Sequence, residues 1–261
     1  MTGHQAPRRG QPPHSNRAPR HVWFAIAACG VLACYNNLAG RRSWHRRWYP
    51  LANGCAAVGA LAVADAAGLT ADDLGLRRDR LRAGLGMGAV TAAPVAAAFA
   101  AAALTPSTRP LLRDKRIASL SRRQLAYQVL LRIPVGTVAW EEIAFRGVLQ
   151  AALNRVMGGR AATATASALF GIWHIRPTAE ALDANGLALD RGARVAAVTA
   201  TVAGTAAAGA LLSVLRERSG SLAAPVLVHL TANCAGPLAQ LVITKTPRSA
   251  DPAARMLAEL G

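Results

Sequence analysis

Long apolar runs alternate with short polar stretches along most of the chain. The runs cover approximately residues 21–39, 51–69, 84–104, 130–153, 161–175, 193–215 and 222–243. Each run is near the roughly 20 residues that an α-helix needs to cross a bilayer. The pattern therefore predicts about seven transmembrane helices and an all-α protein.

The polar stretch between the third and fourth runs differs from the others. Residues 105–128 carry six Lys or Arg side chains with leucines interspersed among them, which is typical of an amphipathic segment at a membrane surface. An eighth, interfacial helix is expected there. The predicted fold class is thus an all-α, polytopic transmembrane bundle of about seven or eight helices, and no internal repeat divides it.

The two ends of the chain do not continue this pattern. Residues 1–20 are rich in Arg, Pro and Gly and should form a disordered basic tail. The membrane domain is expected at 21–246, and 247–261 should be a short C-terminal tail. The run 21–39 could also be a cleaved signal segment ending at Cys34, but its length and the further runs favour a retained helix.

Composition supports the membrane interpretation. Hydrophobic residues make up 52% of the chain and charged residues only 16%, against roughly 25% charged residues in soluble domains. The net charge of +17 lies in the polar stretches, where Lys and Arg face lipid head groups. The expected partner is the lipid bilayer rather than a nucleic acid, since no nucleic-acid-binding motif is present. Because Ala and Arg are so abundant, a bacterial plasma membrane is the expected location.

The cysteines do not indicate a metal centre or a disulfide framework. No CxxC spacing occurs, and each cysteine lies in or beside an apolar run. We therefore expect four small buried apolar residues: Cys29, Cys34, Cys55 and Cys234.

Three ionisable residues interrupt the fourth apolar run. Glu141, Glu142 and Arg146 are costly in an apolar setting, so a functional role is the default hypothesis. Glu142 and Arg146 are four residues apart, the spacing of a helical ion pair. Glu141 is then left without a local partner. A carboxylate at low dielectric is suited to take a proton from water as a general base.

Two histidines and an asparagine lie in later apolar runs. His174 follows Phe170 by four residues, and His229 precedes Asn233 by four, so each pair shares one helix face. Taken singly, each could be a packing residue. The remaining histidines fall in tails or loops: His4, His14, His21 and His45.

The ordered set of motifs, EExxxR, then FxxxH, then HxxxN, resembles the CPBP family of intramembrane proteases. This family includes the CAAX prenyl endopeptidases and proteins of the bacteriocin-processing and abortive-infection type. The resemblance covers about residues 130–244, the expected protease core. It implies a helical bundle that encloses an intramembrane catalytic cavity, and a peptide or protein substrate in or at the membrane.

The resemblance also implies roles for individual residues. Glu141 and His174 would activate the hydrolytic water. His229 and Asn233 would stabilise the tetrahedral oxyanion. Structural support of the site is expected from Glu142, Arg146 and Phe170. Since ionisable groups are costly in lipid, the catalytic side chains should converge on one water-accessible cavity.

Metal dependence stays open from the residues alone. Glu141, His174 and His229 are a donor set that could hold Zn²⁺ with one position left for water. The HExxH spacing of zinc proteases is absent, and a metal-free glutamate mechanism is equally compatible. In a bacterial protein the word CAAX is a family label and does not identify the substrate.

Two other functions remain as alternatives. A non-catalytic immunity or scaffold protein could use the same polar residues to lock its helices together. A transporter is less favoured, because its polar pathway would extend over more helices. Residues 178–193, which follow His174, could form a substrate gate or a solvated connector.

Overall fold

The computed structural model describes residues 17–38 and 42–243. These residues form helices and no strands, so the all-α fold class is confirmed. The expected tails at residues 1–16 and 247–261 lie outside the described residues. Residues 17–20, which we expected in the disordered tail, are instead the first turn of a helix.

In chain order the helices are α1 (Arg17–Leu38), α2 (Ser43–Arg47), α3 (Tyr49–Ala66), η3 (Arg78–Arg80), α4 (Leu81–Leu104), η4 (Arg109–Leu112), α5 (Lys115–Ala118), α6 (Arg122–Tyr127), η5 (Gln128–Ala139), η6 (Glu142–Leu149), α7 (Gln150–Met157), α8 (Gly159–Trp173), α9 (Ile175–Ala184), α10 (Arg191–Ser219) and α11 (Ala223–Ile243). The segments η5 and η6 are π-helical. With α6 and α7 they form one long rod.

All seven apolar runs fall on helices, but fewer of them qualify as membrane spans than we expected. Among the described residues, four helices are long and apolar enough to cross a membrane: Arg20–Leu38, Arg78–Leu104, Arg191–Ser219 and Ala223–Ile243. Three runs are not among these four. The second forms α3, which has 18 residues, and the fifth forms α8, which has only 15, less than a bilayer needs. The fourth carries buried charged residues.

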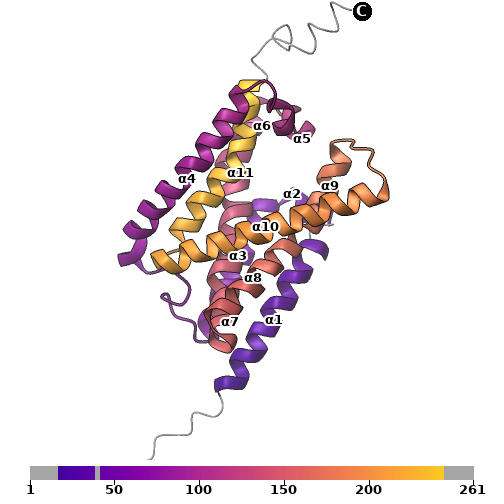
Figure 1. Ribbon diagram of the computed structural model, residues 1–261. Helices are drawn as coiled ribbons and strands as arrows, with labels where there is room; N and C mark the ends of the chain where they lie inside the picture. The colour runs from indigo at the N-terminus through magenta and orange to yellow at the C-terminus, as the bar shows by residue number, and fades with distance from the viewer. Residues whose placement is uncertain (1–16, 39–41, 244–261) are drawn as a thin grey trace, which may run out of the picture.

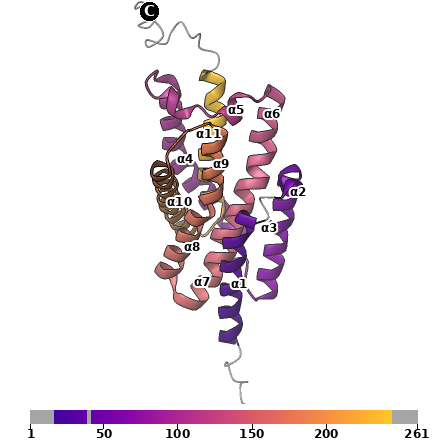
Figure 2. The same ribbon diagram turned by 90° about the vertical axis from the view of Figure 1, so that its right-hand side faces the viewer.

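The helices are arranged around the central rod. Helices α4 and α11 lie side by side along one flank, and α10 crosses α8 on the near side (Figure 1). Turned by 90°, the view shows α3 against the η5 part of the rod (Figure 2). The described chain begins at one end of the bundle with α1 and ends at the other end with α11. The site residues on the rod, α8 and α11 therefore meet in the interior.

Small residues allow the closest helix contacts. A Cβ added to Gly88 of α4 would lie 3.0 Å from the Cα of Ala224 on α11. A Cβ added to Gly171 of α8 would lie 2.6 Å from the backbone oxygen of Val202 on α10. Small residues at such crossings let membrane helices pack backbone to backbone, where dispersion contacts replace the hydrophobic driving force. The Gly- and Ala-rich composition therefore determines how tightly the bundle closes.

Two polar segments differ from expectation. Residues 105–128 form three short helices, η4, α5 and α6, rather than one amphipathic helix. Each has its own start signal: Pro110 lies in the first turn of η4, Asp114 caps α5 and Ser121 caps α6 with a capping box. Residues 178–184 are helical as part of α9 and residues 191–193 as part of α10, so only 185–190 of the expected 178–193 connector is a loop.

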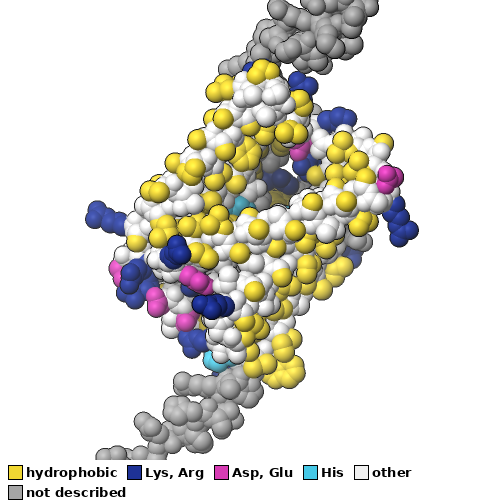
Figure 3. Space-filling view, viewed as in Figure 1, with side chains coloured by type: hydrophobic (Ala, Val, Ile, Leu, Met, Phe, Trp, Pro, Cys, Tyr) yellow, Lys and Arg dark blue, Asp and Glu magenta, His cyan; other side chains and the backbone are white. Residues whose placement is uncertain are grey.

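The cysteines were only partly as expected. Cys234 is buried and Cys29 is partly buried, but Cys34 and Cys55 are exposed. Both lie on apolar helices whose outer surfaces carry hydrophobic side chains. A small apolar side chain suits a lipid-facing surface as well as a core, so burial does not follow from hydrophobicity in such a protein. Figure 3 shows how widely hydrophobic side chains cover the outside of the bundle.

Candidate active site

The acidic pair lies on the central rod, at the junction between the two π-helical segments. Trp140 and Glu141 separate η5 from η6, and Glu142 is the first residue of η6. Both carboxylates are buried, with 5% and 0% of each residue exposed. π-Helical turns are uncommon and recur at functional sites. Here they place two adjacent carboxylates inside the bundle.

One carboxylate oxygen of Glu142 accepts hydrogen bonds from two side chains, Arg146 and His229. Its Oε1 accepts from Arg146 Nη1 at 3.0 Å, the ion pair expected from the sequence. The same Oε1 lies 2.6 Å from His229 Nδ1 on α11. Since a carboxylate oxygen accepts, Nδ1 carries the proton. Glu142 therefore also orients His229, a contact that the sequence did not predict.

Only one carboxylate oxygen of Glu141 accepts a hydrogen bond. Its Oε1 accepts a hydrogen bond from Trp173 Nε1 at 3.1 Å, so it has a partner on α8 that the sequence did not reveal. Its Oε2 is buried without a hydrogen-bond partner in the described structure. That oxygen lies 3.8 Å from His229 Nε2.

Both site histidines contact the phenyl ring of Phe170. Its phenyl ring makes edge contacts with His174 and His229, with centroids 4.7 and 6.0 Å away. The Arg146 guanidinium carbon lies 4.0 Å from the same centroid, within cation–π range. His174 Nδ1 lies 2.7 Å from the Phe170 carbonyl oxygen. This contact fixes the proton on Nδ1 and leaves Nε2 as the acceptor of His174.

Asn233 lies one turn beyond His229 on α11, but its amide does not point freely into the site. Its Nδ2 donates to the backbone oxygen of His229 at 3.2 Å. A side-chain amide has two N–H donors, so one remains for another acceptor. The structure thus brings Glu141, Glu142 and His229 together directly, while His174 joins them through Phe170.

A second polar network lies beside the η5 part of the rod and was not predicted from the sequence. His45 was assigned to a loop but is buried in α2, with 2% exposed. Its Nε2 lies 3.0 Å from Asn53 Oδ1, which also accepts from Tyr35. Asn53 Nδ2 donates to the Gly136 carbonyl oxygen of η5 at 2.6 Å. This network ties α1, α2 and α3 to the rod five residues before Glu141.

Helix α1 also supports the partner of Glu141. Tyr35 stacks on Trp173, with the two rings nearly parallel at 6.0 Å. Asn36 Nδ2 donates to the Trp173 backbone oxygen at 3.0 Å. The sequence signal was the polar Tyr35-Asn36-Asn37 step inside an apolar run. A buried amide in an apolar run therefore indicates a contact with a neighbouring helix, because each such group needs a partner.

The nitrogens of the two site histidines bear on zinc binding. His229 uses Nδ1 for Glu142, and His174 uses Nδ1 for a carbonyl oxygen. Both Nε2 atoms are left free, as in histidines that bind a metal. Within the described part of the chain, however, no group of three His, Cys, Asp or Glu side chains is placed to hold a metal ion. Zinc binding by Glu141, His174 and His229 stays a prediction.

A hollow with a mixed, mainly apolar lining opens near the site. It has a volume of about 340 Å³ and lies between α4, α5, α9 and α11; Figure 3 shows the surface hollowed in this region. Thr178 lines it, and its hydroxyl donates to the His174 backbone oxygen at 2.7 Å. The hollow therefore comes within one helical turn of His174. Part of the 178–193 segment, which the sequence offered as a gate, forms its wall.

Comparison with known families gives one match. Residues 123–235 match the family model of type II CAAX prenyl endopeptidase Rce1-like proteins. This segment of the chain is thus an Rce1-like domain of the CPBP and CAAX protease family, as the motifs indicated. The matched range includes Glu141, His174, His229 and Asn233. Neither a curated protein nor a solved structure matched the chain. At the family level, the domain is that of a membrane protease with a peptide substrate.

Proposed function

We propose that the Rce1-like domain makes this chain an intramembrane endopeptidase of the bacterial plasma membrane, in which Glu141 activates water for peptide hydrolysis. One observation carries the proposal. The buried Oε2 of Glu141 has no hydrogen-bond partner among the described residues and lies 3.8 Å from His229 Nε2. A buried carboxylate oxygen normally accepts a hydrogen bond. This oxygen is therefore available to accept one from a water molecule or a substrate group.

In the first step, Glu141 takes a proton from a water molecule while the water oxygen attacks the carbonyl carbon of the scissile peptide. Trp173 donates to the other Glu141 oxygen and so keeps Oε2 directed into the site. The free Nε2 of His174 accepts a hydrogen bond from the same water and helps to orient it. General-base assistance of this kind contributes roughly 10²- to 10⁴-fold in rate.

The oxyanion that forms needs hydrogen-bond donors. Asn233 offers its second amide hydrogen, and His229 donates from Nε2 in the form that has taken up a proton from solvent and keeps it through the reaction. Glu142 stabilises that imidazolium through Nδ1 at 2.6 Å. Collapse of the tetrahedral intermediate breaks the C–N bond, and the proton held by Glu141 passes to the leaving amine. The products are one carboxylic acid and one amine, so the single water is consumed completely.

The alternative is a scaffold in which these residues only join helices. Glu142, Arg146 and His229 would serve that purpose, since two hydrogen bonds through Glu142 join η6 to α11. The partnerless Oε2 of Glu141 contributes nothing to such a lock and costs stability, because burying an unsatisfied polar group costs roughly 1–3 kcal/mol. The retention of this unpaired carboxylate oxygen 3.8 Å from His229 Nε2 supports a catalytic role.

The test is cleavage of a peptide library by purified protein in detergent. Wild type should cleave members of the library, and Glu141→Gln should lower the rate at least about 100-fold with an unchanged thermal midpoint. Asp79→Asn, which alters an exposed carboxylate that pairs with Arg77, should be fully active. Equal cleavage by wild type and Glu141→Gln would sink the assignment. The same assay with a chelator reports on metal dependence.

A further inference from the structure

A continuous apolar groove runs down the flank of the bundle away from the acidic pair. One part, about 710 Å³, lies between α4, η5 and α11, and a second, about 420 Å³, lies between α6, η5 and α11. The two parts share Val129, Leu130 and Leu238 on their walls. Leu130 and Leu238 are well exposed, so the groove is open to the surroundings of the bundle.

The groove has the length of one lipid leaflet. Along α11 its wall extends from Leu230 to Val242, which at 1.5 Å per residue is about 18 Å. One leaflet is half of the roughly 30 Å hydrocarbon core. The lining residues recur every three to four positions on α4 and α11, so each helix gives one continuous face. A single extended acyl chain matches this length.

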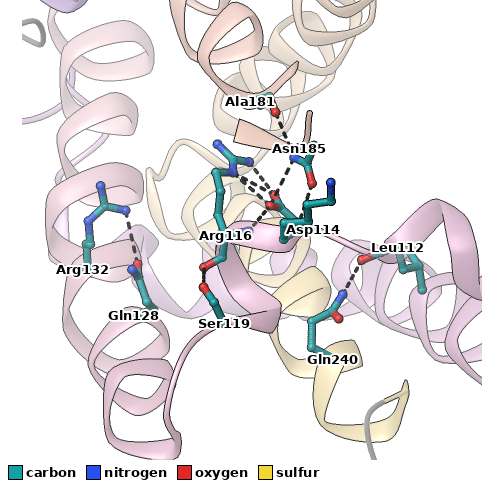
Figure 4. Close-up of polar contacts among 10 residues, drawn as sticks. Leu112, Asp114, Arg116, Ser119, Gln128, Arg132, Ala181, Asn185 and Gln240 are labelled. Atoms are coloured by element: carbon teal, nitrogen blue, oxygen red, sulfur yellow. Dashed lines mark hydrogen bonds and ion pairs between the residues drawn. The ribbon is translucent and has the colours of Figure 1, made fainter. Parts of the chain in front are cut away.

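Cations gather where the groove ends at α6. Residues 105–128 hold six Lys or Arg and one acidic residue, Asp114. Asp114 pairs with Arg116 (Figure 4), and Arg109 donates to backbone oxygens at the end of α4. In the described structure, Arg122 and Arg123 have no acidic partner. Only Arg122 lines the groove.

We propose that this groove binds one acyl chain of an anionic phospholipid, whose phosphate pairs with Arg122. Basic side chains beside a membrane helix attract anionic lipids, and here the cation stands at the mouth of a chain-sized apolar groove. Leu230 follows His229 directly in the sequence and lines the inner part of the groove. A bound lipid therefore packs against the helix that carries His229. This binding is independent of the proposed peptidase activity.

The test uses tryptophan quenching by lipids with brominated acyl chains. Leu238→Trp places a reporter in the groove, and Leu211→Trp places one on the exposed face of α10. Protein without either substitution supplies the background from its native tryptophans. Each protein is reconstituted in phosphatidylcholine vesicles with increasing brominated phosphatidylglycerol, or with brominated phosphatidylcholine. For Leu238→Trp, half-quenching should need about fivefold less of the anionic lipid, whereas Leu211→Trp should not discriminate.

Two neighbouring arginines give the matched controls. In the Leu238→Trp background, Arg122→Gln should abolish the preference for phosphatidylglycerol, and Arg123→Gln should retain it, although both remove one positive charge. Equal quenching of Leu238→Trp by the two lipids would overturn the proposal, and would indicate an apolar occupant without an anionic head group. Equal loss of preference in both arginine variants would also overturn it, since the attraction would then be a diffuse charge effect.

Discussion

Glu142 and His229, 87 residues apart in the sequence, meet inside the bundle with 2.6 Å between Oε1 and Nδ1. Because Arg146 donates to the same oxygen, one buried carboxylate joins a cation on its own helix to a histidine on α11. The residue expected to support the rod therefore also fixes the orientation and proton position of a proposed catalytic histidine. Stability and activity are coupled at Glu142.

Removing Arg146 should destabilise the protein strongly. Arg146→Ala leaves the fully buried Glu142 without its cation, which costs about 3–5 kcal/mol. Arg155→Ala is the matched control, because it breaks the more exposed pair with Asp73 and should cost about 0.2–1 kcal/mol. Thermal unfolding in detergent measures both. An Arg146→Ala protein that is as stable as wild type but inactive would contradict the structural role.

Replacing Trp173 should slow catalysis with little loss of packing. Trp173→Phe keeps an aromatic ring against Tyr35 but removes the N–H that holds Glu141. A hydrogen bond to a charged group contributes about 1.5–3 kcal/mol, so kcat should fall about tenfold or more, with KM nearly unchanged. Trp140→Phe is the control, since the Trp140 Nε1 has no hydrogen-bond partner in the described structure. Equal effects of the two substitutions would argue against the positioning role.

A pair of glycines on α10 tests how closely the site is packed. A Cβ at Gly209 would lie 3.1 Å from Arg146 Nη2 and 3.2 Å from Phe170 Cδ1, whereas a Cβ at Gly204 meets nothing within 4 Å. Gly204→Ala should stabilise by roughly 0.5–1 kcal/mol, as in any helix interior. Gly209→Ala should destabilise by about 1–3 kcal/mol through overpacking. Unfolding midpoints that rise equally in both variants would refute this packing.

Acid should weaken the loop that joins α3 to α4. Partial burial of Asp73 disfavours its charge, but hydrogen bonds from Thr70 and Arg155 outweigh burial and hold its pKa below the usual range. A lowered folded-state pKa gives stability that is present above the unfolded value and lost as pH falls through the folded value. The loss should therefore begin below about pH 4. Between pH 7 and pH 3 the thermal midpoint should fall less for Asp73→Asn than for wild type.

The control for this pH dependence is Asp65→Asn. Asp65 is exposed near the end of α3 and makes no side-chain hydrogen bond in the described structure. This variant should lose stability with acid as wild type does. Should Asp73→Asn also behave as wild type, the hydrogen bonds around Asp73 would not be the source of the acid sensitivity.

The positions of the membrane helices could be predicted from the sequence. A run of about 20 apolar residues in lipid must satisfy its own backbone hydrogen bonds, and a helix does so locally. The i,i+4 pairing of Glu142 with Arg146 was equally local, so it was predicted correctly. The order of the acidic, histidine and asparagine motifs also indicated the family, which the match over residues 123–235 confirmed.

Only the tertiary structure decided which side chains meet across helices. The sequence placed Glu141 without a partner and His45 in a loop, yet Trp173 binds Glu141 and Asn53 holds a buried His45. Local pattern gives the face of a helix but neither its rotation nor its neighbours. Those depend on where small residues such as Gly171 allow backbones to approach, and on how every buried polar group finds a partner. Contacts between distant residues are fixed by that joint packing, because no single segment contains the information.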